Sequence, residues 1–291
     1  MKENPYYSFS QYIRENLNTK AYRVSIDAFF GCKENCIYCE EHYRKPRKLK
    51  IEEQIDNLIP ILRGRYKAKD FYLYFQKGTN TDASVTELKK LYDRVLNYED
   101  FIGLIIGTRP DYVNKKIINL INSYTDRYDT WIEYGLQSSL KSTLKKIQRG
   151  HTYEDFLKAI DITKDTNIKI TVHLIIGLPG ESKEDVITTV RRISSLPIHG
   201  VKFHHLYILK GTPLYQLYLE NKYEPLDYKP FKEILIESIE NLREDIVIHR
   251  IIGEDYSDHF VGPQWGMSKN QIINDIRNTM KKNNRFQGRL F

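Results

Sequence analysis

Cysteine is scarce in this chain of 291 residues. The three cysteines, Cys32, Cys36 and Cys39, lie within eight residues of one another. An odd number of cysteines this close together does not make a disulfide framework. We therefore expect free thiols and, because an oxidising compartment would endanger them, a cytoplasmic protein.

Long hydrophobic runs are also missing. No stretch approaches the roughly 20 apolar residues needed to cross a bilayer, and residues 1–5 contain no apolar signal-peptide core. Hydrophobic residues make up 41% of the chain and charged residues 29%, which excludes the disordered, collagen-like and disulfide-scaffold classes. These absences predict a globular protein with no membrane partner.

The excess of positive charge is modest. Lysine and arginine total 45 and aspartate and glutamate total 38, so the net charge is +7. The excess is spread along the chain and is compatible with a polyanionic partner, but charge alone does not establish nucleic-acid binding.

Six apolar segments rich in β-branched and aromatic residues alternate with segments of helical periodicity. This alternation predicts an α/β protein with a parallel sheet covered by helices, and both barrel and doubly wound folds fit it. The expected strands are 22–29, 70–76, 101–106, 130–136, 168–176 and 200–206, and the expected helices are 51–62, 84–97, 111–124, 139–147, 153–165 and 183–195.

The pattern changes after about residue 210. Two helices at 214–221 and 229–243, a short strand at 246–251 and a final helix at 269–282 are expected there. We therefore divide the chain into three parts. They are an N-terminal segment (1–20), a core (21–210) and a C-terminal extension (211–291) that covers one side of the core.

Polar and glycine-rich residues follow five of the expected strands. In both parallel folds the chemistry gathers at the carboxyl ends of the strands. The residues at these ends are therefore candidates for a site, and they are 31–32, 77–81, 107–110, 137–138 and 177–181.

The cysteines follow the first strand with the spacing C-x3-C-x2-C. Three thiolates on one loop can each bind one iron of a cubane cluster, and the absence of a fourth cysteine leaves one iron open for an outside ligand. A zinc site that uses His42 as its fourth ligand is an alternative. Thiols without any ligand role are a third interpretation.

The cysteine spacing and its place after the first strand resemble the radical S-adenosylmethionine (SAM) superfamily, and Tyr38 matches the aromatic residue that precedes the last cysteine there. The resemblance implies a partial (β/α)6 TIM-like barrel with a C-terminal α/β extension. It implies an enzyme whose [4Fe-4S] cluster, held by Cys32, Cys36 and Cys39, binds SAM and cleaves it to a 5′-deoxyadenosyl radical. An electron donor such as flavodoxin or ferredoxin is implied as a partner.

Further motifs resemble the SAM-contacting segments of the same superfamily. Residues 74–81 correspond to the glycine-bearing end of the second strand, although they depart from its common Gly-Gly-Glu pattern, and residues 173–181 resemble its GLPGET turn. Arg149, twelve residues after Gln137, resembles the arginine that pairs with the SAM carboxylate. The contacts implied by the resemblance are Tyr38, Gln76, Gly78, Thr79, Asn80, Glu133, Gln137, Arg149, His173 and Gly177. Ordinary turns, core packing and hydrogen bonding at a barrel mouth are the alternatives for these positions.

The resemblance narrows to the YhcC/YtqA-like family of Elongator-related radical SAM proteins. The segments that carry it are 74–81, 106–111, 209–214, 248–250, 263–265 with Lys269, and 287–289. That family implies modification of the C5 side chain of the tRNA wobble uridine. A small metabolite or cofactor precursor is an alternative substrate, and a non-enzymatic zinc or iron–sulfur protein is an alternative function.

Positive charge in the tail, at Lys281, Lys282, Arg285 and Arg289, is compatible with a tRNA backbone, but a solvated helix end explains it as well. Other polar or aromatic residues could contact the substrate, although each more often has a structural role. They are Lys77, Arg109, His204, His205, Lys210, His249, Arg250 and Trp265.

Overall fold

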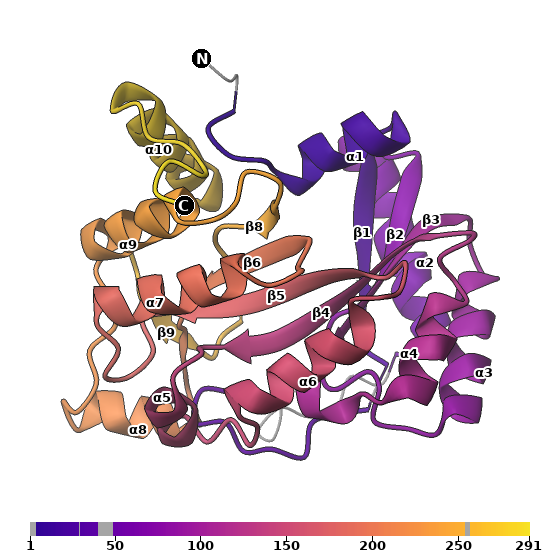
Figure 1. Ribbon diagram of the computed structural model, residues 1–291, viewed down its shortest axis with the longest axis horizontal. Coiled ribbons are helices and arrows are strands. Elements are labelled where there is room, and N and C mark those ends of the chain that lie inside the picture. The colour runs from indigo at the N-terminus through magenta and orange to yellow at the C-terminus, as the bar shows by residue number, and fades with distance from the viewer. Residues whose placement is uncertain (1–3, 29, 40–48, 254–256) are drawn as a thin grey trace.

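The computed structural model describes residues 4–28, 30–39, 49–253 and 257–291, and within them seven parallel strands form one curved sheet (Figure 1). The strands lie side by side in sequence order, so the chain winds around the sheet in one direction, as in a barrel, and not doubly. The predicted α/β partial barrel is confirmed. The strands are β1 (Ala21–Ile26), β2 (Asp70–Phe75), β3 (Phe101–Thr108), β4 (Asp129–Gln137), β5 (Lys169–Ile176), β6 (Gly200–His205) and β8 (Val247–Arg250).

The seventh strand is an addition to the six strands expected in the core. It arises from the short segment predicted at 246–251, and β8 pairs parallel to β6 as the last strand of the sheet. The division of the chain at residue 210 stays a prediction.

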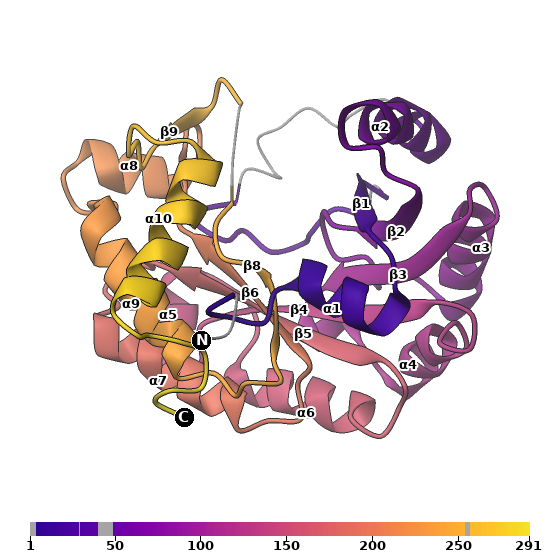
Figure 2. The same cartoon turned by 90° about the horizontal axis from the view of Figure 1, so that it is seen from above.

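Helices cover the outer, convex face of the sheet (Figure 2). Their starts follow local signals, because Ser84, Thr152 and Ser182 form capping boxes with an acidic residue three positions later. The expected helix 111–124 is split, since Asn114 caps a new helix after a short 3-10 turn. The elements are α2 (Ile51–Tyr66), α3 (Val85–Leu96), η1 (Pro110–Tyr112), α4 (Lys115–Asn122), α5 (Lys141–Lys146), α6 (Tyr153–Thr163) and α7 (Lys183–Ser194).

The C-terminal part contributes the helices α8 (Pro213–Leu219), α9 (Tyr228–Glu240) and α10 (Lys269–Lys282). Two short strands that we did not expect, β7 (Ile208–Leu209) and β9 (Phe260–Gly262), pair antiparallel. Glu240, which is completely buried, accepts hydrogen bonds from Arg285 and Arg289 and so anchors the end of the chain.

A further helix, α1 (Phe9–Leu17), lies inside the curve of the sheet (Figure 2). Phe9 and Tyr12 pack edge-on against Trp131, and Phe9 also contacts Tyr72. Tyr12 donates a hydrogen bond to Asp129, at the start of β4, over 2.9 Å. The helix therefore fills the amino end of the half-barrel and leaves the carboxyl end for the site.

None of the helices in the described part of the chain combines the length and hydrophobicity needed to span a membrane.

Candidate active site

A cavity of about 260 Å³ lies toward the carboxyl ends of the strands, between the loops that follow β1 to β3 and residues of β4 and β5. Except for Asn80 and Gly177, all the cofactor and metal ligands predicted from the sequence line it. The lining residues are Cys32, Cys36, Tyr38, Cys39, Gln76, Lys77, Gly78, Thr79, Gly107, Thr108, Arg109, Glu133, Gly135, Gln137, Arg149 and His173.

Backbone hydrogen bonds hold the cysteine loop in place. The carbonyl of Gly31 accepts from the Thr79 N–H (2.7 Å), the Ile37 N–H donates to the Ile147 carbonyl (3.1 Å), and the Ile37 carbonyl accepts from the Leu214 N–H (2.8 Å). The loop is thus attached to the end of β2, the end of α5 and the start of α8. Three segments far apart in the sequence fix where the thiols lie.

The three cysteines form no disulfide and line this one cavity. Among the residues that the structure describes, no group of three His, Cys, Asp or Glu side chains is arranged to hold a single metal ion. The proposed zinc ligand His42 lies outside the described residues. Thiols spread around a cavity suit a cluster, because each thiolate of a cubane binds a different iron.

Glycines permit the close approach of the loop to its neighbours. Gly78 has a φ of +73°, and a Cβ atom there would lie 2.5 Å from the Gly31 carbonyl oxygen. Gly150 has a φ of +78°, and its Cβ would lie 2.1 Å from Glu34 Oε2. A side chain at Gly78 would push the backbone of the cysteine loop away, whereas one at Gly150 would displace the Glu34 side chain; both positions also favour glycine through their positive φ.

Arg149 is buried beside the thiols. Its Nε and Nη2 donate to the carbonyl of Gly135 at 3.2 and 2.8 Å, and its Nη1 donates to Cys36 Sγ at 3.5 Å. Burial by itself lowers the pKa of the guanidinium, but the nearby Tyr38 and Cys36 outweigh it and raise the pKa. No carboxylate of the described residues is bonded to Arg149, so a positive charge faces the cavity.

Arg109 organises this corner of the site. Its Nε and Nη2 donate to the two carboxylate oxygens of Asp111 at 3.0 and 2.7 Å, and its Nη1 donates to the Arg149 carbonyl at 2.7 Å. Its Nη2 also lies 3.7 Å from Glu34 on the cysteine loop. Each of the three guanidinium nitrogens thus donates to a protein group, and these bonds make Arg109 a positioning residue for Arg149.

Several polar atoms in the cavity wall have no hydrogen-bond partner among the described residues. They are buried, and they comprise Thr79 Oγ1, Gln137 Oε1 and His173 Nε2. Such an atom costs roughly 1–3 kcal/mol when it stays unsatisfied. Gln137 also has a φ of +73° at a register shift between β4 and β5, and bulges of this kind re-aim side chains next to active sites. These residues fit a bound polar molecule that supplies the missing hydrogen bonds.

Glu133, deeper in the wall, forms an ion pair that the sequence did not reveal. Lys202 Nζ lies 2.7 Å from Glu133 Oε1, and the Tyr74 hydroxyl donates to the same oxygen at 3.0 Å. Burial lowers the pKa of Lys202 to about 7, although Glu133 opposes this effect. Burial alone would raise the pKa of Glu133, but Lys202 brings it below its usual value. The sequence offered one sign of this placement. Lys202 lies two positions before His204, so both side chains project from the same face of β6.

Two predicted cofactor contacts do not line the cavity. The Nδ2 of Asn80 donates to the carbonyls of Phe75 and Gly107 at 3.1 and 2.8 Å, so this side chain joins the ends of β2 and β3. Gly177 follows β5 with a φ of +95°, and its carbonyl accepts from the Tyr223 hydroxyl at 2.9 Å. In this structure both residues support the walls of the site.

Comparison with known proteins agrees with this geometry. The sequence profile of the radical SAM superfamily matches residues 26–193, and that of the radical SAM C-terminal domain matches residues 198–282. The chain belongs to the radical SAM superfamily. Proteins of this superfamily are enzymes that use a [4Fe-4S] cluster and SAM.

Relatives of similar length narrow the family. The uncharacterized protein MJ0486 of Methanocaldococcus jannaschii is 34% identical over 304 residues, which cover 98% of this chain and 93% of the relative. Protein YhcC of Escherichia coli is 30% identical over 260 residues, which cover 84% of this chain and 82% of the relative. The resemblance to the YhcC/YtqA-like radical SAM family is therefore confirmed.

This chain is also similar to Elongator-related proteins, once in sequence and once in structure. The tRNA uridine(34) acetyltransferase of Methanocaldococcus infernus is 34% identical over 127 residues, which cover 43% of this chain and 23% of the relative. The solved structure of Elp3 from Methanocaldococcus infernus, with an N-terminal deletion, has a TM-score of 0.71 at 19% identity and covers 92% of this chain and 64% of that chain. The radical SAM fold is thus shared with that structure.

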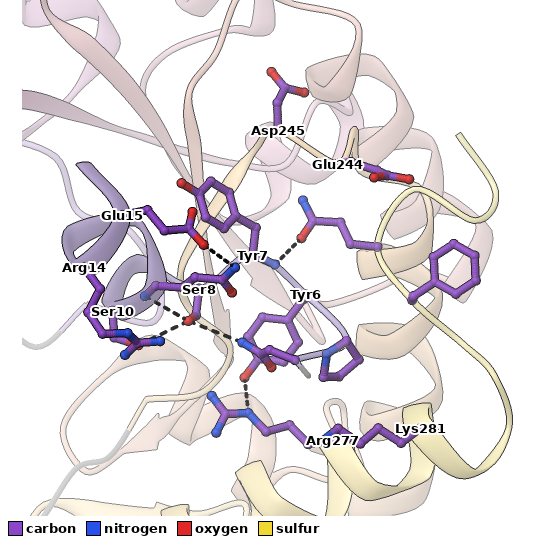
Figure 3. Close-up of a pocket in the computed structure, with 15 residues that line it drawn as sticks. Tyr6, Tyr7, Ser8, Ser10, Arg14, Glu15, Glu244, Asp245, Arg277 and Lys281 are labelled. Atoms are coloured by element: carbon purple, nitrogen blue, oxygen red, sulfur yellow. Dashed lines mark hydrogen bonds between the residues drawn. The ribbon is translucent and has the colours of Figure 1, made fainter. Parts of the chain in front are cut away.

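A larger cavity of about 840 Å³ lies at the other end of this radical SAM protein, between the N-terminal segment, α1 and α10 (Figure 3). Its walls are joined to each other, because Arg277 Nε donates to the Tyr6 hydroxyl at 3.0 Å and the Tyr7 N–H donates to Gln287 Oε1 at 2.8 Å. It contains no cysteine and none of the predicted ligands. The smaller cavity is therefore the candidate active site.

Proposed function

We propose that this radical SAM enzyme binds its cluster through Cys32, Cys36 and Cys39, binds SAM in the adjoining cavity and modifies the C5 side chain of the tRNA wobble uridine. One observation carries the cofactor assignment. The three thiols, the cationic Arg149 and the unpartnered Gln137 Oε1 all meet in one cavity at the carboxyl ends of the strands.

The cluster and SAM, when bound, supply the one-electron chemistry that gives a 5′-deoxyadenosyl radical. The roles of the chain's own residues follow from their positions. Arg149 binds the SAM carboxylate, because a planar guanidinium can bind both carboxylate oxygens. The unpartnered Gln137 Oε1 accepts from a ribose hydroxyl, and Tyr38, which lies beside Cys36, packs against the adenine.

Exclusion of water is the second task of the site. A carbon radical must meet only its target, so the cavity wall has to be closed during the reaction. The sides of the wall come from β-strand ends that are almost fully buried, and Arg109 ties the cysteine loop to β3 and to Arg149.

A tRNA substrate is supported by the similarity to a relative named tRNA uridine(34) acetyltransferase and by the net charge of +7. A reduced cluster needs an electron donor such as flavodoxin or ferredoxin. Free thiols at the cavity favour the reducing cytoplasm as the location.

Mass spectrometry of tRNA nucleosides from a strain that lacks the gene tests the substrate. We expect a wobble uridine with an altered C5 side chain, restored by the wild-type gene and by Arg65→Gln, which changes an exposed residue of α2. Cys36→Ser should fail to restore it. An unchanged nucleoside profile, together with no detectable tRNA binding at low salt, would instead favour a small metabolite as substrate.

Anaerobic reconstitution tests the cofactor separately. We expect four iron and four sulfide per chain, and formation of 5′-deoxyadenosine from SAM after reduction. Stoichiometric zinc with almost no iron would contradict the cluster assignment, whatever the substrate is.

A further inference from the structure

A row of side chains leads from the cofactor cavity across the sheet toward its β8 edge. It consists of consecutive register partners on β4, β5, β6 and β8, namely Gly135, His173, Lys202 and Arg250. The first two line the cavity. Paired residues of neighbouring strands project from the same face, and the strands lie about 4.8 Å apart. Arg250 is therefore about 10 Å beyond His173 across the sheet.

Positive charge exceeds negative charge around this row. Arg23 and Arg250 are cationic, and Lys202, with a pKa that burial lowers to about 7, is cationic when protonated. Glu133 is the carboxylate beside them, and both Lys202 and Arg250 lower its pKa. Glu133 is paired with Lys202 at 2.7 Å. Arg23 instead contacts His249, with 3.0 Å between Nη2 and Nδ1, and stacks over the Phe9 ring. Glu133 therefore offsets one positive charge of the row at most.

The side chain of Arg250 makes no hydrogen bond and no ion pair with any residue that the structure describes, and its Nε is buried. The Nε2 of His173 is also buried without a partner in the described part of the chain. Lys202 Nζ has three N–H donors, and its bonds to Tyr74 and Glu133 leave one donor unused. An excess of positive charge together with buried polar atoms that lack a partner is unfavourable unless an anion is bound nearby.

We propose that Arg250, Lys202 and His173 bind an anionic group, a carboxylate or a phosphate, that the substrate carries. The proposal rests on the radical SAM function proposed above. The guanidinium of Arg250 can bind two oxygens of either group, while Lys202 and His173 each supply one further contact. An anion bound here fixes the substrate beside the cavity in which the radical forms. The three residues therefore favour substrates that carry a carboxylate or a phosphate at this position.

The carboxylate of SAM has a different partner. Arg149 lies at the cysteine loop, with its Nη1 3.5 Å from Cys36 Sγ, whereas Arg250 belongs to β8, three strands away from β4 in the sheet. Two separate cationic positions thus serve two separate anions.

Small anions test the row without turnover. The melting temperature of the anaerobic holoprotein with SAM is measured in sodium acetate and in inorganic phosphate, against sodium chloride of the same ionic strength. We expect a saturable increase with acetate or with phosphate, and the effective anion identifies the group. Arg250→Gln should weaken the response at least tenfold, and Arg250→Lys should keep part of it because the charge remains. Arg65→Gln, which removes an exposed arginine, should respond like the wild type.

Equal responses of Arg250→Gln and the wild type would overturn the proposal, as would the lack of any increase above chloride. Equilibrium dialysis with SAM supplies the second readout. Arg250→Gln should bind SAM as tightly as the wild type does, and a tenfold loss would assign the anion to SAM and overturn the substrate role. Neither result depends on the tRNA nucleoside profile, so failure of this inference and failure of the proposed function are distinguishable.

Discussion

The guanidinium of Arg109 donates a 2.7 Å hydrogen bond to the backbone carbonyl of Arg149. Asp111 holds the other side of the same guanidinium through two hydrogen bonds, at 3.0 and 2.7 Å. One arginine, itself 2% exposed, therefore sets the position of the second, which faces the thiols. Loss of these three hydrogen bonds should weaken SAM binding, because they fix the segment of chain that carries Arg149.

Arg109→Lys should weaken SAM binding by roughly tenfold, equivalent to about 1.4 kcal/mol, because lysine keeps the charge but cannot bridge Asp111 and the Arg149 carbonyl together. Anaerobic equilibrium dialysis measures the affinity, and iron analysis verifies that the cluster is retained. Arg65→Lys is the matched control at an exposed position. SAM affinity equal to that of the wild type would show that the position of Arg149 does not depend on Arg109.

Arg149→Ala should weaken SAM binding more strongly, by roughly ten- to a hundredfold, because a charge-assisted pair contributes about 1.5–3 kcal/mol. The thiols should still hold the cluster, since the loop is fixed by backbone bonds from Thr79, Ile37 and Leu214. Dialysis and iron content are again the measurements. An unchanged affinity would mean that another group binds the SAM carboxylate.

Glu181 predicts a pH dependence of stability. Burial raises the pKa of this carboxyl to about 7, although hydrogen bonds from Ser138 and Thr143 oppose the effect. The folded chain therefore holds a proton that the unfolded chain releases near its ordinary pKa of 4.5. The stability from this group is complete below pH 4.5 and is lost as the pH rises through 7.

We expect Glu181→Gln to remove this dependence, which amounts to roughly 2 kcal/mol after an allowance for partial exposure. Urea unfolding at pH 5 and pH 8 measures it. Glu184→Gln, at a carboxyl that is 69% exposed, serves as the control. The expectation fails if Glu181→Gln and the wild type lose the same stability between the two pH values.

The salt dependence of tRNA binding tests the C-terminal tail. Of the four basic residues expected to contact phosphates, Arg285 and Arg289 instead donate hydrogen bonds to the buried Glu240. Lys281 and Lys282 are exposed. If both contact phosphates, changing them to glutamine should flatten the log–log salt slope by roughly 1.5, since each contact contributes up to about 0.9.

The matched control for this pair is Lys115→Gln with Lys116→Gln, which removes the same charge from the exposed start of α4. Filter binding of tRNA over a range of salt concentrations gives both slopes. Equal slopes for the two double variants would exclude the tail from the interface, and SAM cleavage should stay at the wild-type level in both.

The periodicity of apolar residues in the sequence was sufficient to predict the strands of the core. All six expected core strands are present, because parallel strands buried on both faces are continuous apolar runs. Helix α1 was not predicted, since its reason to form is tertiary: Phe9 and Tyr12 pack against Trp131, more than a hundred positions later. The short β7 and β9 likewise exist only through their pairing with each other.

The sequence predicted most of the residues that line the site, but not the contacts that these residues make with one another. Motif spacing located the thiols, Gln137 and Arg149, which the cavity brings together. It could not show that Asn80 ties strand ends, that Arg109 is occupied by Asp111, or that Lys202 pairs with Glu133. Such contacts depend on strand register, and sequence spacing within one segment carries no information on the register between two strands.

The edge strands β1 and β8 do not pair with each other in the described part of the chain. A closed eight-stranded barrel has a diameter fixed by strand number and stagger, and its interior is just wide enough for side chains. This sheet has no such constraint, and its curvature can be wider than closure would allow. The two edges are joined by side chains instead, because Arg23 of β1 reaches His249 of β8, with 3.0 Å between Nη2 and Nδ1.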